Sequence, residues 1–167
     1  APGSNNLMSQ GSILLVDDDQ SALSSMRDYL NDENFSVTAV TNYTTAIGSI
    51  RRQPPDVVIT DVELGDQDGF DLLKWCQNND VKCPVILLTG FGTIEGAVEA
   101  MRLGAVDYLT KPFSARELIA RVESHLNMSV VRREANIALR ESEIRFRNMA
   151  DHAPVMMWVT DADARCT

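Results

Sequence analysis

The sequence Ile13-Leu-Leu-Val-Asp-Asp-Asp19 places four apolar residues directly before three carboxylates. A short apolar run without polar alternation is typical of a strand that is buried on both faces of a parallel sheet. Further runs of this kind recur along the chain, most of them rich in β-branched residues and leucine. The runs are Ser12–Val16, Phe35–Val40, Asp56–Thr60, Pro84–Leu88 and Val106–Leu109. They predict five parallel strands.

Amphipathic segments separate these runs. Apolar residues recur there at helical spacing, as in Ala22, Leu23 and Met26. Residues that favour the first position of a helix precede the segments and predict helix starts at Ser21, Asn42, Thr93 and Ser114. Because strands alternate with helices over residues 12–127, we predict an α/β domain with a doubly wound five-stranded parallel sheet.

The helical pattern continues past this domain. Residues 114–149 contain neither Gly nor Pro, so we predict an extended C-terminal helix whose later part, residues 128–149, is a linker. Val130, Ile137 and Ile144 recur every seven residues, which indicates a coiled coil and predicts a homodimer through 128–149. Residues 1–11 are small and polar, and we interpret them as a disordered leader.

Charge and composition exclude several classes of function. Residues 1–127 hold 9 Lys and Arg against 18 Asp and Glu, whereas residues 128–167 hold 6 of each. An acidic domain is not expected to bind nucleic acid, which needs a basic surface. The longest apolar runs are far shorter than a membrane span, so no membrane contact is expected. Three cysteines without C-x-x-C spacing are typical of a reduced, cytoplasmic protein.

Polar residues follow the predicted strands. Asp17 and Asp18 follow the first, Asp61 the third, Thr89 the fourth and Lys111 the fifth. In a doubly wound sheet the functional site lies beyond the carboxyl ends of the strands, where these side chains would meet. Crowded carboxylates need a cation to stay ionised, and Mg²⁺ accepts few carboxylates while keeping several waters.

Such a site can take up a phosphoryl group. Asp61 stands alone at its strand end and is the candidate nucleophile, which would form an aspartyl phosphate. Asp17 and Asp18 would hold the metal. Lys111 and the Thr89 hydroxyl would bind phosphoryl oxygens.

These motifs resemble the receiver (CheY-like) domains of two-component response regulators. The matching segments are Ile13–Asp19, Asp56–Asp61, Asp68–Gly69, Leu87–Gly90 and Asp107–Phe113, in the family's order, and the resemblance covers residues 12–127. It implies a flavodoxin-like sheet of strand order 2-1-3-4-5, an arrangement of which the family is a known example. It also implies phosphorelay signalling: a sensor histidine kinase or a phosphotransfer protein donates the phosphoryl group to Asp61.

The same resemblance implies further roles. Asp17, Asp18 and Asp61 would bind Mg²⁺, with the backbone carbonyl of Glu63. Thr89 and Tyr108 would form a switch pair, and Lys111–Pro112 would be a cis peptide. The domain would be a phosphoacceptor rather than an enzyme, supporting only its own phosphotransfer and autodephosphorylation. Residues 150–167 resemble the truncated start of a PAS domain, which implies a PAS or output module downstream.

Alternatives remain at this stage. A Mg²⁺-dependent aspartyl-phosphate phosphatase would share the nucleophile and the metal, and Glu63 stands two residues after Asp61, where such enzymes place a general acid. A receiver used only as an unphosphorylated interaction module is another alternative. His125 lies in a predicted helix without a carboxylate neighbour, and we interpret it as structural or solvated.

Overall fold

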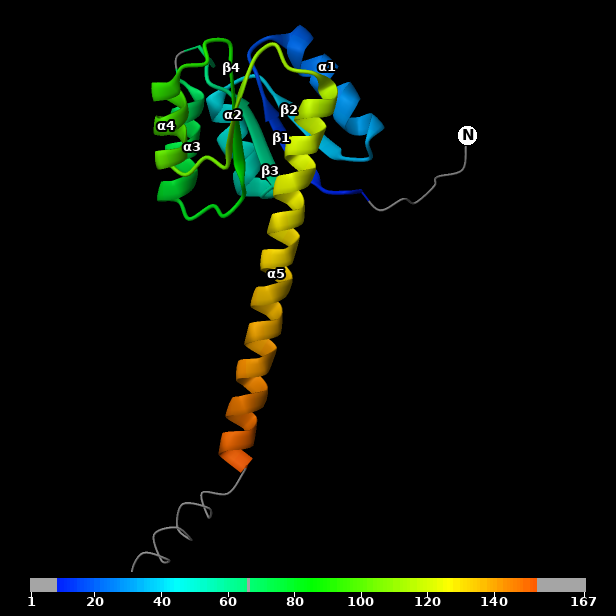
Figure 1. Cartoon of the computed structure of the whole chain (residues 1–167), viewed down its shortest axis with the longest axis vertical. Helices are drawn as coiled ribbons and strands as arrows, with labels where there is room; N and C mark the ends of the chain where they lie inside the picture. Colours follow the sequence, from blue (N-terminus) through cyan, green and yellow to red (C-terminus); the bar gives the residue numbers. More distant parts are fainter. Residues whose placement is uncertain (1–8, 66, 153–167) are drawn as a thin grey trace, which may run out of the picture. The chain divides into compact units, whose positions relative to one another are not determined.

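Five parallel strands form one sheet in the order β2-β1-β3-β4-β5, so the fold class and strand order expected from the sequence are confirmed (Figure 1). The computed structural model describes residues 9–65 and 67–152. The strands are β1 Ser12–Val16, β2 Ser36–Val40, β3 Val57–Asp61, β4 Val85–Thr89 and β5 Asp107–Thr110. The last three start and end one residue later than the apolar runs predict, because the ladder continues into the first polar residue after each run.

Five helices follow the strands. They are α1 Gln20–Asp32, α2 Tyr43–Arg52, α3 Gly69–Asn78, α4 Ile94–Arg102 and α5 Ala115–His152. The predicted starts at Asn42, Thr93 and Ser114 are confirmed, since each side chain accepts a backbone N–H of the first helical turn. The start at Ser21 was wrong, because the Asp19 carboxylate accepts from Ser21 N and Ala22 N, so the cap lies two residues earlier and α1 begins at Gln20.

Alternate residues of each inner strand face different helices. Ile13 and Leu15 pack with α1 and α5 on one face of the sheet, and Leu14 and Val16 pack with α2, α3 and α4 on the other. All four side chains are essentially inaccessible to solvent. This double burial explains why the strands are continuously apolar, and it fixes the strand ends as the place where polar side chains gather.

The chain divides into two units, residues 1–129 and 130–167, and α5 contributes to both. The uninterrupted helix predicted over residues 114–149 is confirmed. Most of the predicted leader and of the PAS-like segment lies outside the described residues, so the proposed domain boundaries stay predictions. Among the described helices, no stretch combines the length and apolarity that a membrane crossing requires.

Candidate functional site

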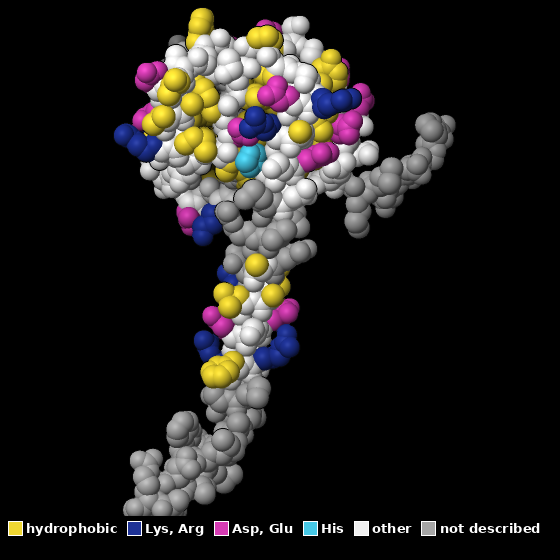
Figure 2. All heavy atoms as spheres, in the orientation of Figure 1, with side chains coloured by type: hydrophobic (Ala, Val, Ile, Leu, Met, Phe, Trp, Pro, Cys, Tyr) yellow, Lys and Arg dark blue, Asp and Glu magenta, His cyan; other side chains and the backbone are white. Residues whose placement is uncertain are grey.

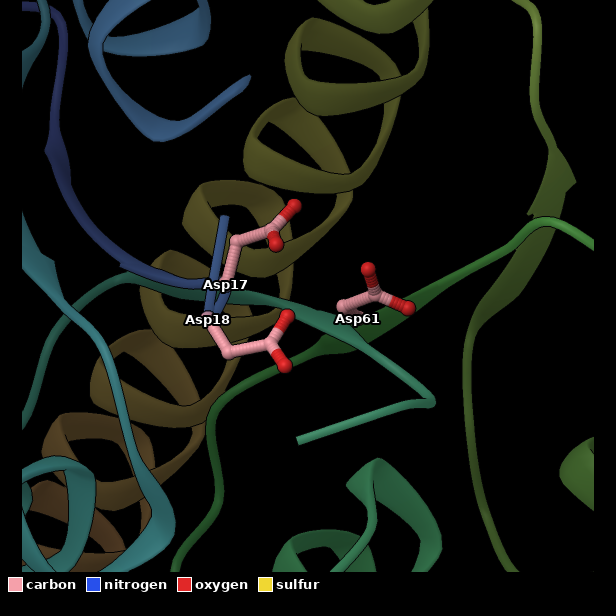
Figure 3. A group of neighbouring side chains, drawn as sticks. All are labelled: Asp17, Asp18 and Asp61. Atoms are coloured by element: carbon pink, nitrogen blue, oxygen red, sulfur yellow. The ribbon is translucent and has the colours of Figure 1, made fainter. Parts of the chain in front are cut away.

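Three carboxylates converge at the carboxyl edge of the sheet. Asp17 and Asp18 follow β1, and Asp61 is the last residue of the neighbouring strand β3. One oxygen from each lies within 4.8 Å of the others, and the Asp17 and Asp18 side chains extend toward the side on which Asp61 lies (Figure 3). The structure therefore brings together the acidic residues that the strand ends predict.

Lys111 joins this cluster from the end of β5. Its Nζ lies 2.7 Å from Asp61 Oδ2 and 3.3 Å from Asp17 Oδ2, and it donates hydrogen bonds to both. The peptide bond between Lys111 and Pro112 is cis, as the resemblance implies. The ammonium thus bridges two carboxylates that come from different strands.

Burial sets the electrostatics of the cluster. Asp17 is completely buried, and this burial raises the pKa of its carboxyl even though the Asp19 N–H and the Lys111 charge favour ionisation. Burial alone would lower the pKa of Lys111, but its hydrogen bond to Asp61 and the charge of Asp17 outweigh it, so the pKa of Lys111 is raised. Lys111 therefore stays an ammonium ion between the two acids.

Backbone amides hold the inner carboxylates in place. Asp19 N donates to Asp17 Oδ1 at 2.9 Å, and Glu63 N donates to Asp61 Oδ1 at 3.0 Å. Gly69 lies against the backbone of Asp61. A Cβ at position 69 would be only 2.5 Å from the Asp61 carbonyl oxygen. The β3–α3 loop is thus folded tightly onto the strand end that carries Asp61.

The donor set fits a hard divalent cation. Among the described residues, the side-chain atoms that could hold a metal here are carboxylate oxygens, and such oxygens suit Mg²⁺ and related ions. When ionised, the three carboxylates and the single ammonium leave a formal charge of −2, which a divalent ion balances. Asp18 is exposed, so the cluster is accessible from solvent.

The two residues expected to form a switch lie on neighbouring strands. Thr89 ends β4 and is 3% exposed, and its Oγ1 accepts a hydrogen bond from Phe91 N at 3.1 Å. Tyr108 is half-buried on β5, with its hydroxyl near Gly96 in the first turn of α4: a Cβ at Gly96 would be 2.7 Å from it. Thr89 thus contacts the segment that joins β4 to α4, and Tyr108 contacts the first turn of α4 itself.

The expectation that His125 has no carboxylate neighbour was wrong. Its Nε2 lies 3.1 Å from Asp107 Oδ2, and Arg121 Nη1 donates to the same carboxylate at 3.0 Å. These contacts lower the pKa of Asp107 despite a burial that acts in the opposite direction. These contacts link β5 to α5. The sequence could predict them only if the packing of α5 against β5 were already known.

A second feature that the sequence interpretation missed is the start of α3. Asp68 and Asp71 each accept a backbone N–H of the other and form a capping box. The acid-x-x-acid spacing just before an apolar run is the signal that could have revealed it.

Comparison with known proteins places these features in a family. The family model described as response regulator receiver domain matches residues 13–123. The alginate biosynthesis transcriptional regulatory protein AlgB of Pseudomonas aeruginosa is 33% identical over 154 residues, which are 91% of this chain and 34% of AlgB. The chain spans between about a quarter and about half of the length of the curated relatives it matches.

Solved structures agree with this match. The crystal structure of NtrX from Brucella abortus superposes with a TM-score of 0.72 at 32% identity, over 77% of this chain and 29% of that one. The receiver domain of the Francisella response regulator 1452 gives a TM-score of 0.69 at 29% identity, over 71% and 98% of the two chains.

Proposed function

The chain belongs to the response regulator receiver domain family, and from that premise we propose that Asp61 accepts a phosphoryl group in a phosphorelay. The donor would be the phosphohistidine of a sensor histidine kinase or of a phosphotransfer protein. The observation that carries this proposal is the position of Lys111 Nζ, 2.7 Å from the Asp61 carboxylate and within the same cluster as Asp17 and Asp18.

The transfer is a displacement at phosphorus. A carboxylate oxygen of Asp61 forms a bond to phosphorus as the phosphorus–nitrogen bond of the donor breaks, and the imidazole nitrogen keeps the electron pair. Charge develops on the phosphoryl oxygens, and an ammonium held beside the nucleophile stabilises it. Lys111 is placed to do this, and the Thr89 hydroxyl would bind a second phosphoryl oxygen.

Asp17, Asp18, Asp61 and the backbone carbonyl of Glu63 would hold Mg²⁺. A bound divalent ion would neutralise part of the negative charge of the carboxylates and the incoming phosphoryl group. The exposed position of Asp18 leaves this part of the cluster open to an ion and to solvent.

The readout of phosphorylation would use Thr89 and Tyr108. To bind the new phosphoryl group, Thr89 Oγ1 would give up its hydrogen bond from Phe91 N. The segment before α4 would then shift, and the Tyr108 hydroxyl, which lies against that helix at Gly96, would move with it. A local change of charge would in this way alter the surface that β5 shares with α4.

The protein would act in the cytoplasm as a regulatory phosphoacceptor rather than as an enzyme with turnover. Phosphorylation would control a PAS or other output module downstream of α5. We also propose that two copies of the chain associate through residues 128–149.

A phosphorylation assay with a small donor tests the proposal. With acetyl phosphate and Mg²⁺, we expect the wild type to gain one phosphoryl group that alkali or hydroxylamine removes, and Asp61→Asn to gain none. Asp28→Asn, at an exposed position on α1, should match the wild type. Phosphorylation of Asp61→Asn at the wild-type rate would overturn the proposal, and repeated turnover of a small phosphate ester would favour the phosphatase alternative.

A further inference from the structure

The later part of α5 carries large apolar side chains on its surface. Ile137, Leu139, Ile144 and Phe146 are 54%, 60%, 58% and 75% exposed. Figure 2 shows apolar side chains lying among Arg and Glu side chains along this helix. An isolated helix gains little stability without packing, so such a surface calls for a partner.

The four side chains form two stripes. Each helical residue turns the chain by about 100°, so residues seven apart share one side. Ile137 and Ile144 form one stripe, and Leu139 and Phe146 form the other. Leu139 is about 200° from Ile137, so the two stripes lie on nearly opposite sides. A two-stranded coiled coil buries only one of them.

The isoleucine stripe is poorly suited to pairing with its own copy. A coiled-coil seam combines two sets of heptad positions, a and d. With Ile137 and Ile144 at a, Arg140 and Arg147 fall at d. With the isoleucines at d, Glu134 and Glu141 fall at a. Either arrangement faces like charges across a parallel pair, which destabilises it.

The leucine stripe has uncharged residues at both sets of positions. Ala135, Leu139, Ser142 and Phe146 are spaced by four, three and four residues, which is the spacing of alternating d and a positions. No charged residue falls at these positions between 135 and 149, and Arg132 marks the start of the seam. Ala135 and Ser142, like Leu139 and Phe146, are exposed in this single chain and available to a partner.

We propose that a second copy of this chain binds the stripe Ala135–Leu139–Ser142–Phe146 in a parallel, in-register coiled coil. In that pair each layer brings the same residue from both copies, so large layers alternate with small ones. The positions on either side of the seam are also compatible with this pairing. Glu143 of one copy lies beside Ala138 of the other, so no like charges meet there. The inference rests on the proposed association of two copies. It places the contact on the side of α5 opposite to the Val130–Ile137–Ile144 heptad.

Matched substitutions on the two sides test this seam. We expect Leu139→Glu to weaken dimerisation at least about a hundredfold, because it places two carboxylates face to face in the seam. Ile137→Glu, the same change on the same helix, should leave the dimer intact. Analytical ultracentrifugation of the full 167-residue chain over a concentration series measures both, and circular dichroism checks that each variant keeps its helix.

Each result of this experiment tests a different claim. A monomeric wild type at the highest concentration would overturn the association of two copies itself. Dissociation by Ile137→Glu, or no effect of Leu139→Glu, would overturn the seam alone. The measurement uses no phosphodonor, so its result is independent of whether Asp61 is phosphorylated.

Cysteine cross-linking gives a second readout. In a background without native cysteines, Ser142→Cys should form an intermolecular disulfide, since identical seam residues face each other at bonding distance. Ile144→Cys lies on the outer side and should not. Cross-linking through Ile144→Cys in place of Ser142→Cys would contradict the proposal.

Discussion

Lys111 governs the charge balance of the site. It is the only described cation that contacts the cluster, and it bridges Asp17 and Asp61 with distances of 3.3 and 2.7 Å. Two ionised carboxylates this close would otherwise favour protonation of one of them. Lys111 therefore balances part of the negative charge of the two carboxylates, and in the proposed transfer it would present a positive charge to the phosphoryl group.

Replacing Lys111 with methionine keeps much of the side-chain volume and removes the charge. We expect Lys111→Met to slow phosphorylation by acetyl phosphate about a hundredfold or more, the usual loss for one electrostatic donor at a reacting centre. Lys74→Met, at an exposed position on α3, is the control. Phosphorylation of Lys111→Met at the control rate would show that the ammonium does not assist the transfer.

At this scale the sequence predicts the inner site well. Asp17, Asp61 and Lys111 each follow an apolar run, and parallel strands bring such positions to one edge. The contact between Asp107 and His125 could not be predicted, because it depends on how α5 is rotated against β5. Ser21 also has a side chain that favours a helix start, so the sequence alone does not choose between it and Asp19 as the cap of α1.

The first turn of α4 is an element shaped by contact with β5. Gly96 leaves room for the Tyr108 hydroxyl, whereas Gly48 in α2 has open space where a Cβ would stand. A glycine inside a helix costs stability relative to alanine unless a contact requires it. The two positions therefore form a matched pair.

We expect Gly48→Ala to raise the free energy of unfolding by about 0.5–1 kcal/mol, the usual difference in helix propensity. Gly96→Ala should not show this gain, because its Cβ would lie 2.7 Å from Tyr108 Oη and displace that side chain. Denaturant unfolding measures the stability, and the NMR signals of the Tyr108 ring report the displacement. An equal gain at both positions with unchanged Tyr108 signals would refute this role of Gly96.

A charged cluster joins β5 to α5. The Asp107 side chain is 12% exposed and accepts hydrogen bonds from Arg121, with His125 Nε2 at 3.1 Å. Its pKa lies below the ordinary value of 3.8, since these contacts outweigh the effect of burial. The folded state is therefore favoured while this carboxyl is ionised.

Asp107→Asn should lower the free energy of unfolding at pH 7 by about 1–3 kcal/mol, as expected for a hydrogen bond to a charged group. The contribution is present above the unfolded pKa of 3.8 and is lost as pH falls through the lower folded pKa. The difference from the wild type should thus vanish in acid. Urea unfolding over a pH series measures it, and a difference that persists unchanged well below pH 3.8 would contradict the assignment.

Strands β1, β3 and β4 were predictable because they are buried on both faces of the sheet, so each is an apolar run followed by polar residues. The sequence pattern alone could not determine which side of α5 would bind a second copy of the chain. A seven-residue repeat of isoleucines is visible in the sequence, yet the competing stripe contains Ala135 and Ser142, whose small side chains give a weak apolar signal.

At the scale of the whole molecule, the formal net charge of −9 favours the binding of cations. A ligand that binds only the folded state stabilises it by mass action. We expect Mg²⁺ to raise the melting temperature of the wild type in a concentration-dependent way. Asp18→Asn removes one proposed, exposed ligand and should shift this dependence to at least about tenfold higher Mg²⁺. An unchanged dependence would exclude Asp18 as a ligand.

The central claim is that Asp61 is the residue that carries the phosphoryl group, and chemical trapping tests it most directly. Borohydride reduces an acyl phosphate on aspartate to homoserine, which peptide mass spectrometry locates in the sequence. After treatment with acetyl phosphate and Mg²⁺, the account predicts homoserine at position 61 and unchanged aspartate at positions 17 and 18. Homoserine at position 17 or 18 in place of position 61 would contradict it.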